Sequence, residues 1–176
     1  MTLEPAWSLE LPRARIHRFT PLLQRGVGVR ASAGRSVAAF LTGDLGLAPD
    51  YVGTRIATVF LDDQVVDDIE EARLRAGSRL ALSAAMPGLV GATLRRGGHY
   101  AAMRAAITRV ASAAPAPPER PATIQVAVFN LLLAEVGPAL LARGVLVGRE
   151  EARDLAGDAP GEPPGAGPVA LRVRFA

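Results

Sequence analysis

The order of short apolar segments in the first half of the chain constrains its fold more than any other feature. Two segments with the apolar–polar alternation of strands come first, and an amphipathic helix capped by Ser36 follows. Three further segments are rich in β-branched and apolar residues, and turn residues separate them. The sequence therefore predicts strands at residues 14–20 and 26–31, a helix at 36–45, and strands at 55–61, 65–66 and 79–84.

Two of these stretches carry a family resemblance. Residues 59–66 read Val-Phe-Leu-Asp-Asp-Gln-Val-Val, and residues 76–82 read Ala-Gly-Ser-Arg-Leu-Ala-Leu. With the element order, they resemble the β-grasp (ubiquitin-like) superfamily, and within it the bacterial sulfur carriers, namely the molybdopterin-synthase small subunit and the thiamine sulfur carrier. The resemblance covers residues 14–86. It implies an α+β domain, a mixed sheet with one packed helix, which a C-terminal helix and strand segment extends.

The second half of the chain has a different character. Residues 87–98 contain four glycines and predict a loop, and residues 99–113 have the apolar spacing of an amphipathic helix. Residues 114–121 form a proline-rich linker. Residues 122–176 predict a strand, a helix that Asn130 caps and that restarts at Gly137-Pro138, and a final strand. This last segment either folds separately or completes the first domain.

The composition excludes several kinds of chemistry. The 176 residues include no cysteine, no lysine and only two histidines, His17 and His99, which excludes thiol nucleophiles and the common zinc sites. The acidic residues of segment 62–71 lack the ligand spacing of a calcium loop. No nucleophile, base and oxyanion site can be assembled. We therefore expect no catalytic residues, no cofactor and no metal.

Charge and hydropathy give weaker indications. The net charge of +3 and the pI of 10.4 come from 20 arginines distributed along the chain. Arg95, Arg96, Arg104 and Arg109 are the nearest to a cluster, and they allow an RNA-binding β-grasp module as one alternative. The least polar stretch, residues 124–147, is interrupted by polar residues and a proline. We expect no membrane span and a cytoplasmic protein.

The diglycine Gly97-Gly98 follows two arginines, as in the tails of ubiquitin-like proteins. The resemblance implies a second alternative, a sulfur carrier or modifier precursor that is processed after Gly98. The same segment could hold an anion, with Arg95, Arg96, Gly97, Gly98 and His99 as donors at a helix start. We prefer the simpler interpretation, a flexible loop before a helix, because glycine is common in turns.

Apolar residues exceed what a small β-grasp core needs, so they either pack back on the sheet within the chain or form an interface with another chain. We expect a non-enzymatic adaptor or assembly protein that binds a protein partner or itself through an apolar helix face and sheet edges. The candidate interface residues are Tyr100, Met103, Ile107, Val110, Leu132, Leu133, Val136 and Leu140.

Overall fold

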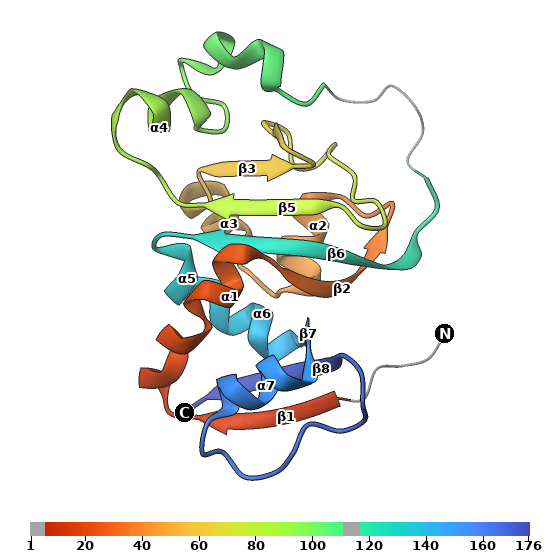
Figure 1. Cartoon of the computed structure of the whole chain (residues 1–176). Coiled ribbons are helices and arrows are strands. Elements are labelled where there is room, and N and C mark those ends of the chain that lie inside the picture. Colours follow the sequence, from red (N-terminus) through yellow and green to blue (C-terminus); the bar gives the residue numbers. More distant parts are fainter. Residues whose placement is uncertain (1–5, 111–116) are drawn as a thin grey trace.

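The computed structural model describes residues 6–110 and 117–176. Over these residues the chain is α+β, and its strands form one mixed eight-stranded sheet in the order β1-β8-β7-β2-β6-β5-β3-β4 (Figure 1). The strands are β1 (Ala6–Leu11), β2 (Val27–Ala33), β3 (Thr58–Leu61), β4 (Gln64–Val65), β5 (Arg79–Ser83), β6 (Arg120–Phe129), β7 (Val145–Val147) and β8 (Val169–Phe175).

Strand β6 lies in the middle of the sheet although it comes late in the sequence. It pairs antiparallel with β2 along all seven residues of β2, and parallel with β5 on its other side. Strand β3 pairs antiparallel with β5 and β4. A second part of the sheet contains β1, β8 and β7, and it joins the first part where Gly28 of β2 pairs with Leu146 of β7. Residues 122–176 therefore contribute strands to both parts of the sheet.

The predicted strand at residues 14–20 is wrong. These residues form the 3-10 helix η1 (Arg13–Phe19), and α1 (Thr20–Arg25) follows directly. The segment is flanked by prolines, Pro12 at the N-cap of η1 and Pro21 in the first turn of α1, and the fixed φ of proline suits the start of a helix. The position beside β2 that this strand would have taken is occupied by β6.

The predicted helix after Ser36 is confirmed, with a change in its shape. The Ser36 hydroxyl accepts a hydrogen bond from the Ala39 amide, as an N-cap does. The helix is short α2 (Val37–Ala39), and it continues as a π-helical turn, η2 (Phe40–Asp44). A further helix, α3 (Pro49–Arg55), was not expected, and it shortens the predicted strand at 55–61 to β3.

The turn between β3 and β4 forms as predicted. Asp62 and Asp63 both have positive φ angles, 52° and 65°, which is a conformation that aspartate tolerates better than most residues. Strand β4 then returns beside β3, and β5 follows after the turn at Gly77-Ser78.

The helix after β6 is broken as predicted, into α5 (Leu132–Glu135) and α6 (Gly137–Arg143), and α7 (Arg149–Ala156) follows β7. Asn130 does not act as a side-chain cap: its amide side chain instead bonds the Ala84 amide and the Ser83 hydroxyl at the end of β5. Leu132, Val136 and Leu140 are fully buried in the core, and Leu133 packs partly buried against it. Their assignment to an interface is therefore wrong.

Residues 87–110 differ from both elements predicted there. The expected loop at 87–98 contains helix α4 (Gly88–Leu94), and the expected helix at 99–113 is a 3-10 helix, η3 (Ala101–Ile107), which is kinked at Arg104. Gly91 is a packing glycine rather than a loop glycine, because a Cβ there would lie 1.9 Å from the Met86 carbonyl oxygen. The predicted linker at 114–121 lies partly outside the described residues, and its end, from Arg120, belongs to β6.

Candidate functional site

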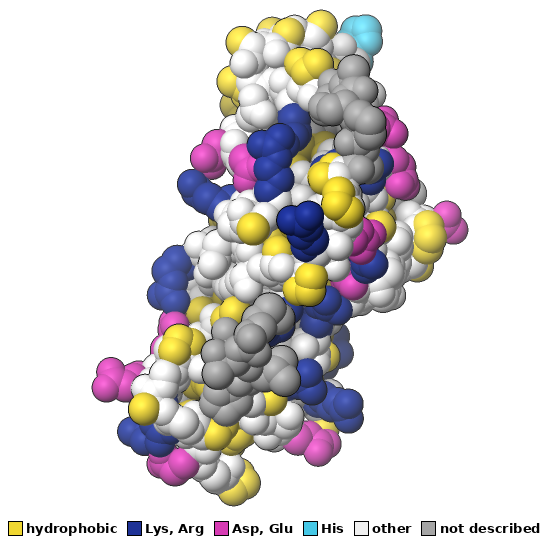
Figure 2. All heavy atoms as spheres, turned by 90° about the vertical axis from the view of Figure 1, so that its right-hand side faces the viewer, with side chains coloured by type: hydrophobic (Ala, Val, Ile, Leu, Met, Phe, Trp, Pro, Cys, Tyr) yellow, Lys and Arg dark blue, Asp and Glu magenta, His cyan; other side chains and the backbone are white. Residues whose placement is uncertain are grey.

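The segment from Gly88 to Val110, which we call the excursion, leaves the sheet after β5 and forms one end of the molecule (Figure 1). Among the described residues, six of the eight exposed large apolar side chains lie on it. Their exposed fractions run from 44% for Tyr100 to 86% for Val110. Figure 2 shows apolar side chains gathered at this end of the molecule. The six, which we call the apolar face, are Leu89, Val90, Tyr100, Met103, Ile107 and Val110.

The excursion turns its apolar side chains outward because an arginine takes the inward position. Arg104 is only 5% exposed, whereas Met103 beside it is 66% exposed. The backbone leaves helical geometry at Arg104, with φ −117° and ψ 19°. The four residues predicted as one helix face, Tyr100, Met103, Ile107 and Val110, are therefore all exposed and do not pack on the sheet.

The Arg104 guanidinium is held by five acceptors. Two of its nitrogens contact the two carboxylate oxygens of Asp67, at 2.6 and 3.0 Å. The others are the carbonyl oxygens of Thr93 and Arg95 and the Thr108 hydroxyl, at 2.6 to 3.1 Å. Hydrogen bonding from Arg104 holds the pKa of Asp67 below its ordinary value. This fork-like pairing ties η3 to α4 and to the segment after β4.

Arg96 attaches the other side of the excursion. Its amide donates to the Ala57 carbonyl at 2.7 Å, and its guanidinium donates to the carbonyls of Val52 and Ile56, at the end of α3. Burial lowers the pKa of this guanidinium. Carbonyls at a helix end are unpaired within the helix and attract a cation. The side chain thus supports the fold through one of its terminal nitrogens, Nη2, while its buried Nε has no hydrogen-bond partner among the described residues.

The diglycine is part of a fixed turn. The Gly97 amide donates to an Asp67 carboxylate oxygen at 2.8 Å, and the Gly98 amide donates to the Arg95 carbonyl at 3.1 Å. Gly97 has a φ of +59°, which favours glycine. The 3-10 helix begins beyond it, at Ala101, and the rings of His99 and Tyr100 meet edge to face. The structure does not bring Arg95, Arg96, Gly97, Gly98 and His99 together as an anion site, since Arg96 is engaged elsewhere.

The aspartates of segment 62–71 have structural partners. Asp62 accepts from the Arg79 amide, and Asp68 accepts from the amides of Glu70 and Glu71. In the part of the chain that the structure describes, no three His, Asp or Glu side chains are grouped so as to hold a metal ion. No helix among these residues has the length and apolar character needed to cross a membrane.

A second arginine–carboxylate pair lies far from the apolar face in sequence and joins α3 to α5. Glu135 accepts from two nitrogens of the Arg55 guanidinium, Nε and Nη2, and from the Tyr51 hydroxyl, the latter at 2.7 Å. These bonds lower the pKa of Glu135 to about 2. Burial and the contact with Glu135 raise the pKa of Tyr51. The cluster acts as a clamp between two helices.

No protein-family model, curated protein or solved structure matches this chain.

Sequence reasoning found four of the six residues of the apolar face and missed Leu89 and Val90. The glycines on either side of that pair made the segment look like a loop, and the packing role of Gly91 has no local signal. The burial of Arg104 and Arg96 was also missed. One indication was present, because each arginine lies among apolar residues with few acids nearby in sequence.

Proposed function

We propose that this protein is a non-enzymatic binding module, and that the apolar face of the excursion docks on another protein. One observation carries the proposal: the excursion is fastened by two engaged arginines, yet its large apolar side chains are uncovered. Monomeric proteins rarely expose such groups together unless the patch binds something. A surface held in one shape costs less entropy on binding than a mobile loop would.

For the fold, we propose a β-grasp in which one strand is supplied from the C-terminal half. Strand β2, the α2–η2 helix, β3, β4 and β5 follow one another as the resemblance implies. Strand β6 takes the place of the missing first hairpin strand, antiparallel to β2 and parallel to β5. The excursion is then the connection that carries the chain from the last β-grasp strand back to this position.

The charge around the apolar face indicates the chemistry of the partner. No aspartate or glutamate occurs from residue 72 to residue 118, and Arg95 and His99 are exposed on the excursion. In a symmetric contact a second copy of this chain would bring the same acid-free segment, which itself carries no counter-charge for Arg95. We therefore propose a different protein, with an apolar surface bordered by acidic residues.

The two alternatives gain less support from the geometry. An RNA-binding surface would use four arginines, but the Arg104 guanidinium is bonded within the fold on all its nitrogens, and Arg96 Nη2 donates to two backbone carbonyls. A carrier needs a thin free tail, whereas Gly97 is bonded to Asp67, and cleavage after Gly98 would remove Arg104 from its partner. Replacing Gly97 and Gly98 by alanine would abolish a carrier's function and leave a binding module nearly intact.

A photo-crosslinking side chain at position 103 tests the proposal in the living cell. The matched control places the same side chain at Leu131, which is also apolar and exposed, 59% against 66% for Met103. We expect position 103 to join one defined protein through a peptide rich in apolar and acidic residues, and position 131 not to join it. The partner is then purified, and Met103→Asp should weaken its binding at least tenfold while Leu131→Asp does not.

Three results would contradict the proposal. They are crosslinks at position 103 no stronger than at 131, crosslinks to RNA, and a chain that ends at Gly98.

A further inference from the structure

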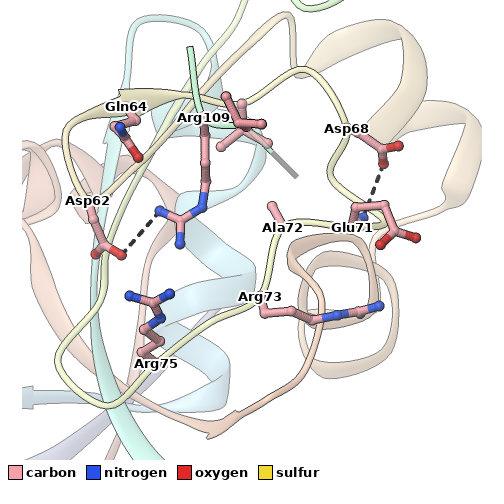
Figure 3. Close-up of a pocket in the computed structure, with 10 residues that line it drawn as sticks. Asp62, Gln64, Asp68, Glu71, Ala72, Arg73, Arg75 and Arg109 are labelled. Carbon is pink, nitrogen blue, oxygen red and sulfur yellow. Dashed lines mark hydrogen bonds and ion pairs between the residues drawn. The ribbon is translucent and has the colours of Figure 1, made fainter. Parts of the chain in front are cut away.

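A pocket of about 350 Å³ lies beside β4, between the β3–β4 turn and residues 72–75, and the end of the excursion closes one side. Three of the side chains that line it are arginines, Arg73, Arg75 and Arg109 (Figure 3). The volume falls in the range of small-ligand sites. Six of the ten lining side chains are charged, and Val110 is the one residue of the apolar face that borders the pocket.

Two guanidinium groups converge at one end of this pocket. In Figure 3 the side chains of Arg75 and Arg109 point toward each other and toward Asp62. Arg109 reaches Asp62 only at 3.5 Å and the Leu61 carbonyl at 3.4 Å, which are long contacts for an arginine. Among the described residues, the Arg75 guanidinium has no hydrogen-bond or ion-pair partner, although its backbone amide is bonded to Ser78.

Asp62 does not neutralise both arginines. One of its carboxylate oxygens accepts from the Arg79 amide at 2.9 Å, and the other accepts from the Ser78 hydroxyl at 3.3 Å. The remaining acids of the lining, Asp68 and Glu71, lie on the opposite side of the pocket, with Arg73 (Figure 3). The end of the pocket with Arg75 and Arg109 therefore holds two positive charges and one carboxylate, Asp62, whose oxygens already accept hydrogen bonds from Ser78 and Arg79.

We propose that this end of the pocket binds an oxyanion, a phosphate or carboxylate group, between the guanidinium groups of Arg75 and Arg109. Guanidinium donors are arranged as a planar fork that matches such oxygens, and paired arginines are the usual way to hold them. An anion there would relieve the repulsion between the two like charges and complete the hydrogen bonding of both side chains.

Titration of the 15N-labelled protein with inorganic phosphate, and separately with acetate, at constant ionic strength tests this site. The test variant is Arg75→Gln. The Arg75 guanidinium makes no hydrogen bond or ion pair with the described residues, so its loss should not disturb the fold. The control is Arg79→Gln, which removes the same charge from a nearby exposed arginine that pairs with Asp63. We expect saturable shifts at residues 62, 75 and 109, weakened about tenfold or more in Arg75→Gln and little changed in Arg79→Gln.

The two arms separate the sources of the anion, because tighter binding of phosphate indicates a phosphorylated ligand and tighter binding of acetate a carboxylate. The proposal is overturned if the shifts do not saturate. It is overturned equally if both variants lose the same affinity, since a diffuse positive field would then explain the binding.

Discussion

Two stretches of this chain have similar apolar spacing in sequence, but one is exposed to solvent and the other is buried in the core. The excursion places Tyr100, Met103 and Ile107 in solvent, whereas α5 and α6 bury Leu132 and Leu140 completely. Each stretch is apolar at helical spacing, and each follows a strand of the sheet. Apolar spacing therefore identifies a face that must be covered, but it does not say whether this chain or another one covers it.

The difference follows from what anchors each stretch. Helices α5 and α6 follow the central strand β6 and pack directly against the core, so apolar contact holds them. The excursion follows β5 and is anchored mainly by polar bonds of Arg96 and Arg104, which leave its apolar residues free. A polar anchor on one face and apolar groups on the other is what a rigid docking surface requires.

Truncating one large apolar side chain in each kind of environment gives the largest contrast in stability. We expect Leu140→Ala to lower the free energy of unfolding by about 2–5 kcal/mol, because it leaves a cavity in a fully packed core. Met103→Ala should change it by less than about 0.5 kcal/mol, as exposed sites do. Urea denaturation of both variants measures this. If Met103→Ala lowers the free energy of unfolding as much as Leu140→Ala, the apolar face packs against other parts of this same chain.

The polar anchor can be broken without touching the apolar face. Asp67→Asn leaves the buried Arg104 guanidinium without its carboxylate partner. We expect the free energy of unfolding to fall by about 3 kcal/mol, the lower end of the range for buried ion pairs, because Asp67 is partly exposed. The loss should be local, so that amide hydrogen exchange accelerates at residues 95–108 and stays slow in β6. Asp63→Asn, which breaks an exposed pair with Arg79, is the matched control.

If Asp67→Asn accelerates amide hydrogen exchange uniformly over the whole sheet, the result would contradict the anchoring role of Asp67. It would show that the excursion unfolds only together with the core.

The clamp formed by Glu135 with Arg55 and Tyr51 should contribute less to the free energy of unfolding, and its contribution should depend on pH. The pKa of Glu135 is lowered to about 2 from an ordinary 4.5, so its ionised form stabilises the fold above pH 4.5, and this contribution is lost as the pH falls toward 2. At pH 7, Glu135→Gln should cost roughly 1 kcal/mol or less, because the pair is near the surface. Thermal unfolding of both proteins from pH 7 to pH 2 should show the difference closing below pH 4.5. A difference that is constant with pH would contradict the assignment.

The sequence predicted those parts of the fold that depend on neighbouring residues. Ser36 caps a helix, two aspartates make the turn at 62–63, and Gly137-Pro138 interrupts a helix, all for local reasons. The position of β6 was not predictable in this way, because its partners in β2 lie about ninety residues earlier in the chain. The 3-10 helix at 13–19 follows from that exchange of strands as well as from the two prolines.

For the candidate site, the sequence identified apolar residues but not their anchors. Arg104 looked like a surface cation because arginine usually is one, and its burial depends on Asp67, thirty-seven residues away. The same holds for Gly97, whose amide is bonded to that carboxylate and not free in a tail. Contacts of this range require the tertiary structure.

The measurement that tests the central claim most directly is native mass spectrometry of the protein purified from its own cells, compared with Met103→Asp and Leu131→Asp. We predict that the unmodified chain and Leu131→Asp are recovered with the same additional protein subunit. Met103→Asp should be recovered alone at about the mass of the chain, 18.3 kDa. An unmodified chain that is alone under these conditions, or a Met103→Asp variant that retains the subunit, would contradict the claim that the apolar face is a docking surface.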